Sequence, residues 1–179
     1  MYFRVDDIPT KYRHPEQAQF DECLRAVDFA PRYDALCAAH PKRGPEVPVG
    51  ARMPALQGTG RRWYYNRQFK FYALRERERL PKYCGLGLDL RIDARVETAL
   101  LFSTPDGHLS APLAKLARNM HRFTEPGFVY RPAAHPAPRI GSLEELPAIL
   151  TDCLALYDLL AEAIRAAGDW WRPALARAA

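Results

Sequence analysis

Three carboxylates in the middle of the chain, Asp89, Asp93 and Glu97, follow one another at intervals of four residues. Such oxygen ligands could hold a divalent metal ion if the fold brought them together. A metal-dependent nuclease would also need a Lys two residues after Glu97, where this sequence has Ala99. Carboxylates spread along a half-exposed hairpin are more typical of a solvated surface. We therefore predict no metal site and no cofactor, with a site built from these three carboxylates as the alternative.

Two histidines and an asparagine form a second group with catalytic potential. His108 precedes a predicted helix that carries Asn119 and His121, an order that loosely resembles HNH-type nucleases. The spacing from Asn119 to His121 is far too short for that motif, and only Asp106 lies close enough in sequence to orient His108 as a base. This group therefore does not predict a nuclease.

The common sequence motifs of enzymes are missing as well. The chain has no G-x-S-x-G nucleophile elbow, no Walker A loop, no G-x-G-x-x-G and no H-E-x-x-H. Its GLGLDL stretch, residues 85–90, lacks the third Gly and the following helix of a dinucleotide-binding motif. We predict a protein that is not an enzyme, and an enzyme of unrecognised type is the alternative.

The strongest functional signal is the segment 61–83, RRWYYNRQFKFYALRERERLPKY, which combines seven aromatic residues with eight Lys or Arg residues. It holds two acidic residues, whereas the rest of the chain has 18 basic and 19 acidic residues, so the net charge of +5 arises here. On a folded surface this segment would attract an acidic partner. The predicted partner-binding residues are Arg61, Arg62, Tyr64, Arg67, Lys70, Arg75, Arg77 and Arg79.

Nucleic acid is the alternative partner for this segment. Lys and Arg would neutralise phosphates while Tyr64 and Tyr72 offered stacking surfaces, as in single-strand binding proteins. Two features argue against it. Glu76 and Glu78 interrupt the basic run, and most other rings of the segment are expected in the core.

Composition and length predict an ordinary soluble protein with a single domain, residues 1–179. The start MYFRVDDIPTKY has no signal-peptide pattern, and no apolar run is long enough to cross a bilayer. We therefore expect a cytoplasmic protein without a membrane partner. The four widely spaced cysteines are predicted to be reduced and mostly buried. They are Cys23, Cys37, Cys84 and Cys153.

Alternation of residue types predicts strands between residues 61 and 104. Apolar residues alternate with small or charged ones over 85–93, and residues 96–103 follow after a short connection, so the two runs should pair antiparallel. Residues 61–73 are predicted as one strand with an aromatic face turned to the core, and the run 75–79 as the turn or strand end after it. The side chains of that face are Trp63, Tyr65, Arg67, Phe69, Phe71 and Ala73.

Helices are predicted before and after these strands. Apolar spacing favours helices that begin at Pro15 and Pro31, and a third after Ser110. In the C-terminal stretch, Ser142 and Glu145 form a capping box, Gly168 is a natural helix stop, and Pro147 either bends the helix or makes it restart there.

These elements together predict an α+β fold. A small, mainly antiparallel sheet of three or four strands, from about residues 61–104, would carry the N-terminal and C-terminal helices on one face. Residues 128–131 are a further candidate strand at the edge, and residues 40–60, with four Pro and four Gly, are predicted as a loop.

The Ala, Arg and Pro richness and the ending SLEELPAILTDCLALYDLLAEAI, residues 142–164, are similar in general style to the small immunity proteins that bacteria encode beside polymorphic or contact-dependent toxins. The resemblance implies a stoichiometric inhibitor that occludes a toxin's active site and has no catalysis of its own. Inhibitors of nucleases tend to be acidic, whereas this chain is basic, so its toxin partner should show an acidic surface. We therefore rank a protein-binding module first and a nucleic-acid-associated protein second.

Overall fold

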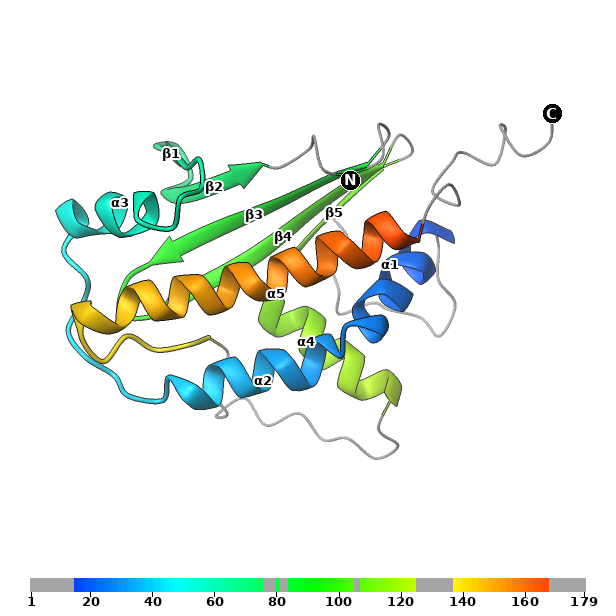
Figure 1. Ribbon diagram of the computed structural model, residues 1–179, viewed down its shortest axis with the longest axis horizontal. Coiled ribbons are helices and arrows are strands. Elements are labelled where there is room, and N and C mark those ends of the chain that lie inside the picture. Colours follow the sequence, from blue (N-terminus) through cyan, green and yellow to red (C-terminus); the bar gives the residue numbers. More distant parts are fainter. Residues whose placement is uncertain (1–14, 76–79, 81–83, 105–106, 125–136, 168–179) are drawn as a thin grey trace.

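The computed structural model (Figure 1) describes residues 15–75, 80, 84–104, 107–124 and 137–167. Within these residues the predicted α+β fold is confirmed. The helices are α1 (Pro15–Ala26), α2 (Phe29–Ala39), α3 (Val49–Gln57), α4 (Leu113–Thr124) and α5 (Leu146–Ala166). The strands are β1 (Tyr64–Asn66), β2 (Phe71–Arg75), β3 (Gly85–Ile92), β4 (Val96–Thr104) and β5 (Gly107–Pro112).

The five strands form one sheet in the order β1-β2-β3-β4-β5, and each is antiparallel to its neighbours. The predicted pairing of the two central runs is confirmed, because β3 pairs with β4 along its whole length. One face of β3 is apolar and buried, as its alternation indicated, whereas Arg91 on the other face is exposed. The buried side chains of that face are Leu86, Leu88, Leu90 and Ile92.

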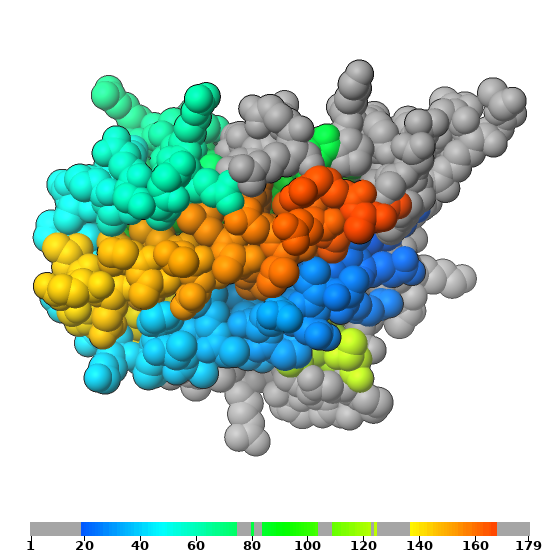
Figure 2. Space-filling view, in the orientation of Figure 1, coloured from blue at the N-terminus to red at the C-terminus, as the bar shows by residue number. Residues whose placement is uncertain are grey.

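Helices from both ends of the chain cover the same face of the sheet, as predicted. Figure 1 shows α5 lying along the strands, with α1, α2 and α4 on the same side, and in Figure 2 α5 lies between α3 and the pair α1 and α2. The hydroxyl of Tyr157 on α5 donates a hydrogen bond of 3.1 Å to the carbonyl of Leu86. The ring of Phe20 on α1 stacks on Phe102 of β4 with 4.8 Å between centroids. These contacts join the helical layer to the sheet around one apolar core.

The prediction of one continuous strand over residues 61–73 is wrong, because this segment turns back on itself between β1 and β2. The side-chain oxygen of Asn66 accepts the N–H of Phe69 at 3.1 Å, and the Asn66 carbonyl accepts the N–H of Lys70 at 2.8 Å. Lys70 has a left-handed backbone with φ of 55°, which closes the turn. The predicted aromatic face is therefore split between the two sides of the sheet.

The sheet is also larger than predicted, because residues 107–112 form β5, and this strand includes Ala111 and Pro112, which were predicted as the start of a helix. β5 pairs with β4 from Thr104↔Gly107 to Ala99↔Pro112, and α4 begins only at Leu113. The apolar stripe expected of this helix is buried all the same. The candidate strand 128–131 and the run 76–79 lie outside the described residues.

Residues 40–60 are not wholly a loop, because α3 forms within them. The helix follows Pro48 and tolerates Pro54 near its end. Leu56 is fully buried in the core, and Arg52 on the same helix pairs with Glu46 at 2.8 Å and Asp93 at 3.3 Å. Burial and ion pairing outweigh the local cost of the proline here.

The long C-terminal helix restarts at its proline, one of the two predicted outcomes. A 3₁₀ turn, η3 (Leu143–Glu145), precedes α5, and Pro147 lies in the first turn of that helix. The hydroxyl of Ser142 makes no capping bond to the backbone, whereas the carboxylate of Glu145 accepts the N–H of Gly141 at 3.0 Å. Neither of the two bonds of the predicted capping box is formed, because the carboxylate of Glu145 binds the N–H of Gly141 and not that of Ser142. Gly168 lies outside the described residues.

Candidate partner-binding surface

The β1–β2 hairpin carries most of the large exposed rings of the described residues. Tyr64, Tyr65 and Phe69 keep 49%, 43% and 64% of their surface accessible to solvent. The ring of Phe69 packs against that of Phe71 with 6.2 Å between centroids, and Tyr65 lies 5.0 Å from Tyr72 across the two strands. The rings of Tyr65 and Phe69 are therefore each held by a neighbouring ring while part of each faces solvent.

Exposed basic side chains flank β1 and belong to the turn after it. Arg62, Arg67 and Lys70 are all exposed, and Arg67 and Lys70 belong to the turn that joins β1 to β2. The predicted binding residues Arg62, Tyr64, Arg67 and Lys70 thus lie together on this hairpin. Arg75 belongs to β2, and Arg77 and Arg79 lie outside the described residues.

Arg61 has a different position from the other predicted binding residues. Its side chain is largely buried, and its Nη2 atom lies 2.5 Å from Oδ2 of Asp158 on α5. Two residues further along, the indole N–H of Trp63 donates to the hydroxyl of Thr59 at 3.0 Å. These contacts fix the base of the hairpin to the helical layer, so Arg61 supports the surface and is not part of it.

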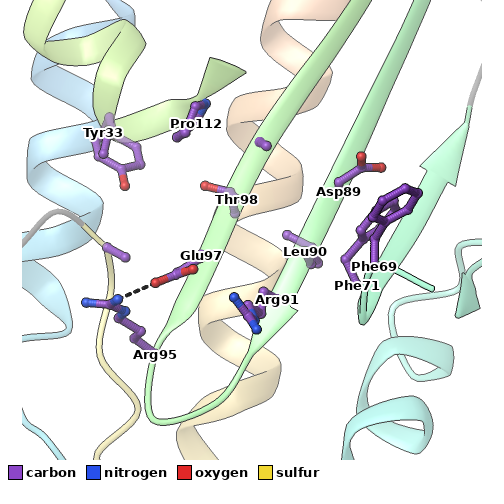
Figure 3. Close-up of a pocket in the computed structure, with 13 residues that line it drawn as sticks. Tyr33, Phe69, Phe71, Asp89, Leu90, Arg91, Arg95, Glu97, Thr98 and Pro112 are labelled. Carbon is purple, nitrogen blue, oxygen red and sulfur yellow. Dashed lines mark ion pairs between the residues drawn. The ribbon is translucent and has the colours of Figure 1, made fainter. Parts of the chain in front are cut away.

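A groove of about 440 Å³ lies on the face of the sheet opposite α5 and extends to the edge of β4 (Figure 3). Phe69 and Phe71 line one end, and Tyr33, Pro112 and Ala137 line the other. Ala99 of β4 is part of its floor. Phe69 belongs to both the groove and the hairpin, and Tyr64, paired with Ala73, is on the groove side of the sheet. Tyr65 is paired with Tyr72 and lies on the opposite, helix-covered side.

Charged side chains of both signs line the groove. Asp89 and Arg91 come from β3, Glu97 comes from β4, and Arg95 precedes β4. Arg95 forms an ion pair with Glu97, drawn as a dashed line in Figure 3. Two acidic and two basic groups cancel in net charge, in contrast to the basic hairpin beside them.

The buried side of the groove contains a hydroxyl without a hydrogen-bond partner among the described residues. Thr98 is 5% exposed, and its Oγ1 makes no hydrogen bond there. In Figure 3 this oxygen points from β4 toward Tyr33. Thr98 is paired with the buried Leu90, so its hydroxyl lies on the helix-covered side of the sheet, away from Glu97 and Ala99. A buried hydroxyl without a partner loses its bonds to water, typically at a cost of about 1–3 kcal/mol.

Two of the three carboxylates considered for a metal site are paired with arginines. Asp93 lies 3.3 Å from Arg52 and 3.6 Å from Arg91, and Glu97 pairs with Arg95. In the part of the chain that the structure describes, no group of three or more His, Cys, Asp or Glu side chains is arranged to hold a metal ion.

The histidines pair with carboxylates between helices. His121 on α4 lies 2.6 Å from Asp34 on α2, and His40 lies 3.2 Å from Asp152 on α5. Both histidine side chains are largely buried. These pairs join helices to each other and lie apart from the residues that line the groove.

The four cysteines are free thiols, and all four are buried, as predicted. Burial raises the pKa of Cys23 and Cys37 from 9.0 to about 11, and that of Cys84 to about 12. Burial raises the pKa of Cys153 as well. A thiol that stays protonated is a poor nucleophile and a poor metal ligand, so these four side chains act as small apolar core residues.

A comparison of the chain with protein-family models, curated proteins and solved structures gives no match. The helices in the described ranges are all too short or too polar to cross a membrane.

Proposed function

We propose that this protein is a non-catalytic binding module whose β1–β2 hairpin docks against an acidic surface of another protein. The observation that carries the proposal is the exposure of Tyr64, Tyr65 and Phe69 among the exposed basic residues Arg62, Arg67 and Lys70. Tyr and Arg are enriched among the residues that dominate protein interfaces, and Phe is enriched in interface cores. The positive charge would steer an acidic partner and increase its association rate.

The finer form of the proposal is an inhibitor of the immunity type, which binds a toxin or an enzyme in a stoichiometric complex. The hairpin lies at the margin of the sheet, where β1 is the edge strand (Figure 1). Its base is held to α5 by Arg61 and Asp158. A protrusion that is rigid before binding loses little conformational entropy when it enters a concave site.

Capture of partners from the native lysate at about 150 mM salt, a concentration that screens weak exposed charge pairs, tests the proposal. The tagged full-length protein is compared with Arg67→Glu/Lys70→Glu, with and without nuclease. We expect one stoichiometric protein that survives nuclease and is lost with the charge reversal. The matched control is Lys42→Glu/Arg43→Glu, which makes the same charge change at two exposed residues between α2 and α3. Equal capture by both variants would contradict the proposal.

Association with nucleic acid is the second candidate, and the exposed rings favour it. Tyr64, Tyr65 and Phe69 are available for base stacking beside basic side chains, the combination that single-strand binding proteins use. Asp89 and Glu97 in the adjoining groove oppose it, because they would repel phosphates. Binding of a labelled 15-nucleotide dT strand, with an affinity that falls steeply as salt rises and is lost in Arg67→Glu/Lys70→Glu, would favour this candidate over the first.

A further inference from the structure

We propose that the β1–β2 hairpin binds with both of its faces, by inserting into an acidic cleft of the partner protein whose two walls contact opposite sides of the hairpin. This inference rests on the proposed function and adds the shape of the partner's site to it. Three features of the hairpin carry the inference, namely aromatic rings exposed on both faces, an excess of basic side chains, and a base that is fixed to the rest of the fold.

The two tyrosines of β1 lie on opposite faces of the hairpin, because successive side chains of a strand alternate between its faces. Tyr64 is paired with Ala73 and lies on the outer face of the sheet. Tyr65 is paired with Tyr72 and lies on the helix-covered face. Even so, Tyr64 and Tyr65 keep 49% and 43% of their surface accessible to solvent. At β1 both faces are therefore open to a partner, whereas β3 buries one of its faces.

Opposite positions of the rings define the shape of the site that can contact them. A flat surface could contact one of the two rings only, because the backbone of the hairpin lies between them. A cleft that receives the hairpin contacts both. Layers of sheet pack about 10 Å apart, so the backbones of the two cleft walls would be about 20 Å apart. The three residues of β1 would enter such a cleft by about 10 Å.

The charge of the hairpin defines the chemistry of the cleft. Arg62, Arg67 and Lys70 are exposed, and residues 62–70 contain no Asp or Glu. None of the ion pairs among the described residues involves these three side chains. Their positive charge is therefore available to a partner, and carboxylates on the cleft walls would supply the complementary charge.

Contacts at the base hold the hairpin in one orientation for insertion. Arg61 pairs with Asp158 on α5 at 2.5 Å, and the indole N–H of Trp63 donates to the hydroxyl of Thr59 at 3.0 Å. The carbonyl of Asn66 accepts the bond that closes the turn at the other end. A hairpin that is ordered at both ends loses little conformational entropy when it is enclosed.

Photocrosslinking from each face tests the inference on the tagged full-length protein. Tyr64 or Tyr65 is replaced by p-benzoylphenylalanine, which keeps an aromatic ring at each position, and the partner is supplied by nuclease-treated native lysate. We expect both variants to crosslink to the same protein. The control is the same replacement of Leu143, which is 45% exposed on η3, and it should give no crosslink to that protein. Crosslinks from only one of the two tyrosines would overturn the inference.

Affinity for the partner captured by the unmodified protein gives a second measurement. Tyr64→Ala and Tyr65→Ala should each weaken binding by about tenfold or more, because each variant loses the contact with one wall. Leu143→Ala, which removes an exposed apolar side chain elsewhere, should bind like the unmodified protein. Dependence on only one of the two tyrosines would contradict a cleft. If Tyr65→Ala fails to fold, the crosslinks decide, because they keep the ring at this position.

The cleft and the function proposed for the hairpin fail in different ways. Capture that is lost in Arg67→Glu/Lys70→Glu, with crosslinks from one tyrosine only, contradicts the cleft alone. Capture that is insensitive to this charge reversal contradicts the proposed function, and with it the acidic character of the cleft. No captured protein, or only nucleic acid crosslinked to both tyrosines when nuclease is left out, would overturn both.

Discussion

Nη2 of Arg61 lies 2.5 Å from Oδ2 of Asp158, and this ion pair joins the start of the β1–β2 hairpin to the middle of α5. The two residues are 97 positions apart in sequence. Arg61 is the more buried partner, so the pair is less screened by solvent than an exposed one. Its role is to hold the base of the hairpin, while Arg67 and Lys70 at the turn remain exposed.

The first prediction separates support of the hairpin from binding by it. Arg61→Gln and Asp158→Asn should each lower the free energy of unfolding by about 1 kcal/mol, since the pair is only partly buried. The double variant should cost less than the two single variants together, because the interaction is lost only once. Urea denaturation of the four proteins measures this coupling. Strictly additive losses would show that the pair contributes nothing.

The turn between β1 and β2 gives a second prediction. Lys70 has a left-handed backbone, which Gly adopts without a steric cost. Lys70→Gly should therefore be more stable than Lys70→Ala by about 0.5–1 kcal/mol, although both remove the same charge. Thermal unfolding of the two variants tests this, and equal stability would show that the turn relaxes to another conformation when Lys70 is replaced.

Two glycines with opposite surroundings give a third prediction. A Cβ atom on Gly44 would lie 2.1 Å from the carbonyl oxygen of Gly141, whereas one on Gly50 in α3 would meet no atom within 4 Å. Gly44→Ala should cost about 2–4 kcal/mol by forcing the backbone apart. Gly50→Ala should stabilise α3 by about 0.5–1 kcal/mol. If both variants unfold at the same urea concentration, the close approach of Gly44 and Gly141 is not rigid.

The buried thiols give a fourth prediction, on the dependence of stability on pH. Burial raises the pKa of Cys37 to about 11, above the ordinary value of 9.0. Below pH 9 the thiol is protonated in both the folded and unfolded states, so its contribution to stability is fully present. Between pH 9 and 11 the unfolded chain loses the proton while the folded protein keeps it, and stability falls as the pH rises.

Urea unfolding under reducing conditions at pH 8 and pH 10.5 measures this loss. The free energy of unfolding should fall by roughly 2 kcal/mol for Cys37, and the drop should be smaller in Cys37→Ala. The same drop in the variant and in the unmodified protein would assign the loss to other groups.

The parts of the fold that are predictable from the sequence are those in which one periodic pattern dominates. Each of these elements has one continuous apolar face, which comes from strict alternation in β3 and from apolar stripes in α4 and α5. Burial of that face in the core stabilises the element in the predicted conformation. The restart of α5 at Pro147 follows from the missing N–H of proline. These are local rules that act on one element at a time.

The wrong predictions of secondary structure occur where a local sequence pattern competes with hydrogen bonds or burial that the pattern does not reveal. Trp63 through Ala73 alternate like one strand, but the carbonyl and side chain of Asn66 both accept hydrogen bonds that turn the chain. Asn66 is the residue in this segment that indicates a turn, because Asn favours turns. α3 was missed because Pro and Gly predicted a loop, whereas burial of Leu56 stabilises the helix.

The candidate site was predictable in part. The charge and the rings of segment 61–83 indicate a surface, and Arg62, Tyr64, Arg67 and Lys70 are all exposed on or beside the β1–β2 hairpin. The exposure of Phe69 and the burial of the Thr98 hydroxyl could not be predicted from the sequence, because each depends on how the strands pair. No spacing in the sequence marks Thr98 as different from any threonine in a strand.

The shortness of β1 limits pairing with other molecules at this edge of the sheet, although the hairpin displays aromatic rings. An exposed edge strand offers unpaired backbone groups to the edge strands of other molecules, and long apolar edges promote aggregation. β1 pairs only three residues, and Arg62 precedes it while Arg67 follows it directly. A strand from another molecule would therefore find few backbone groups of β1 to bond, and it would meet a positive charge near each end of β1. The same hairpin that displays rings to a partner is thus a poor template for self-association.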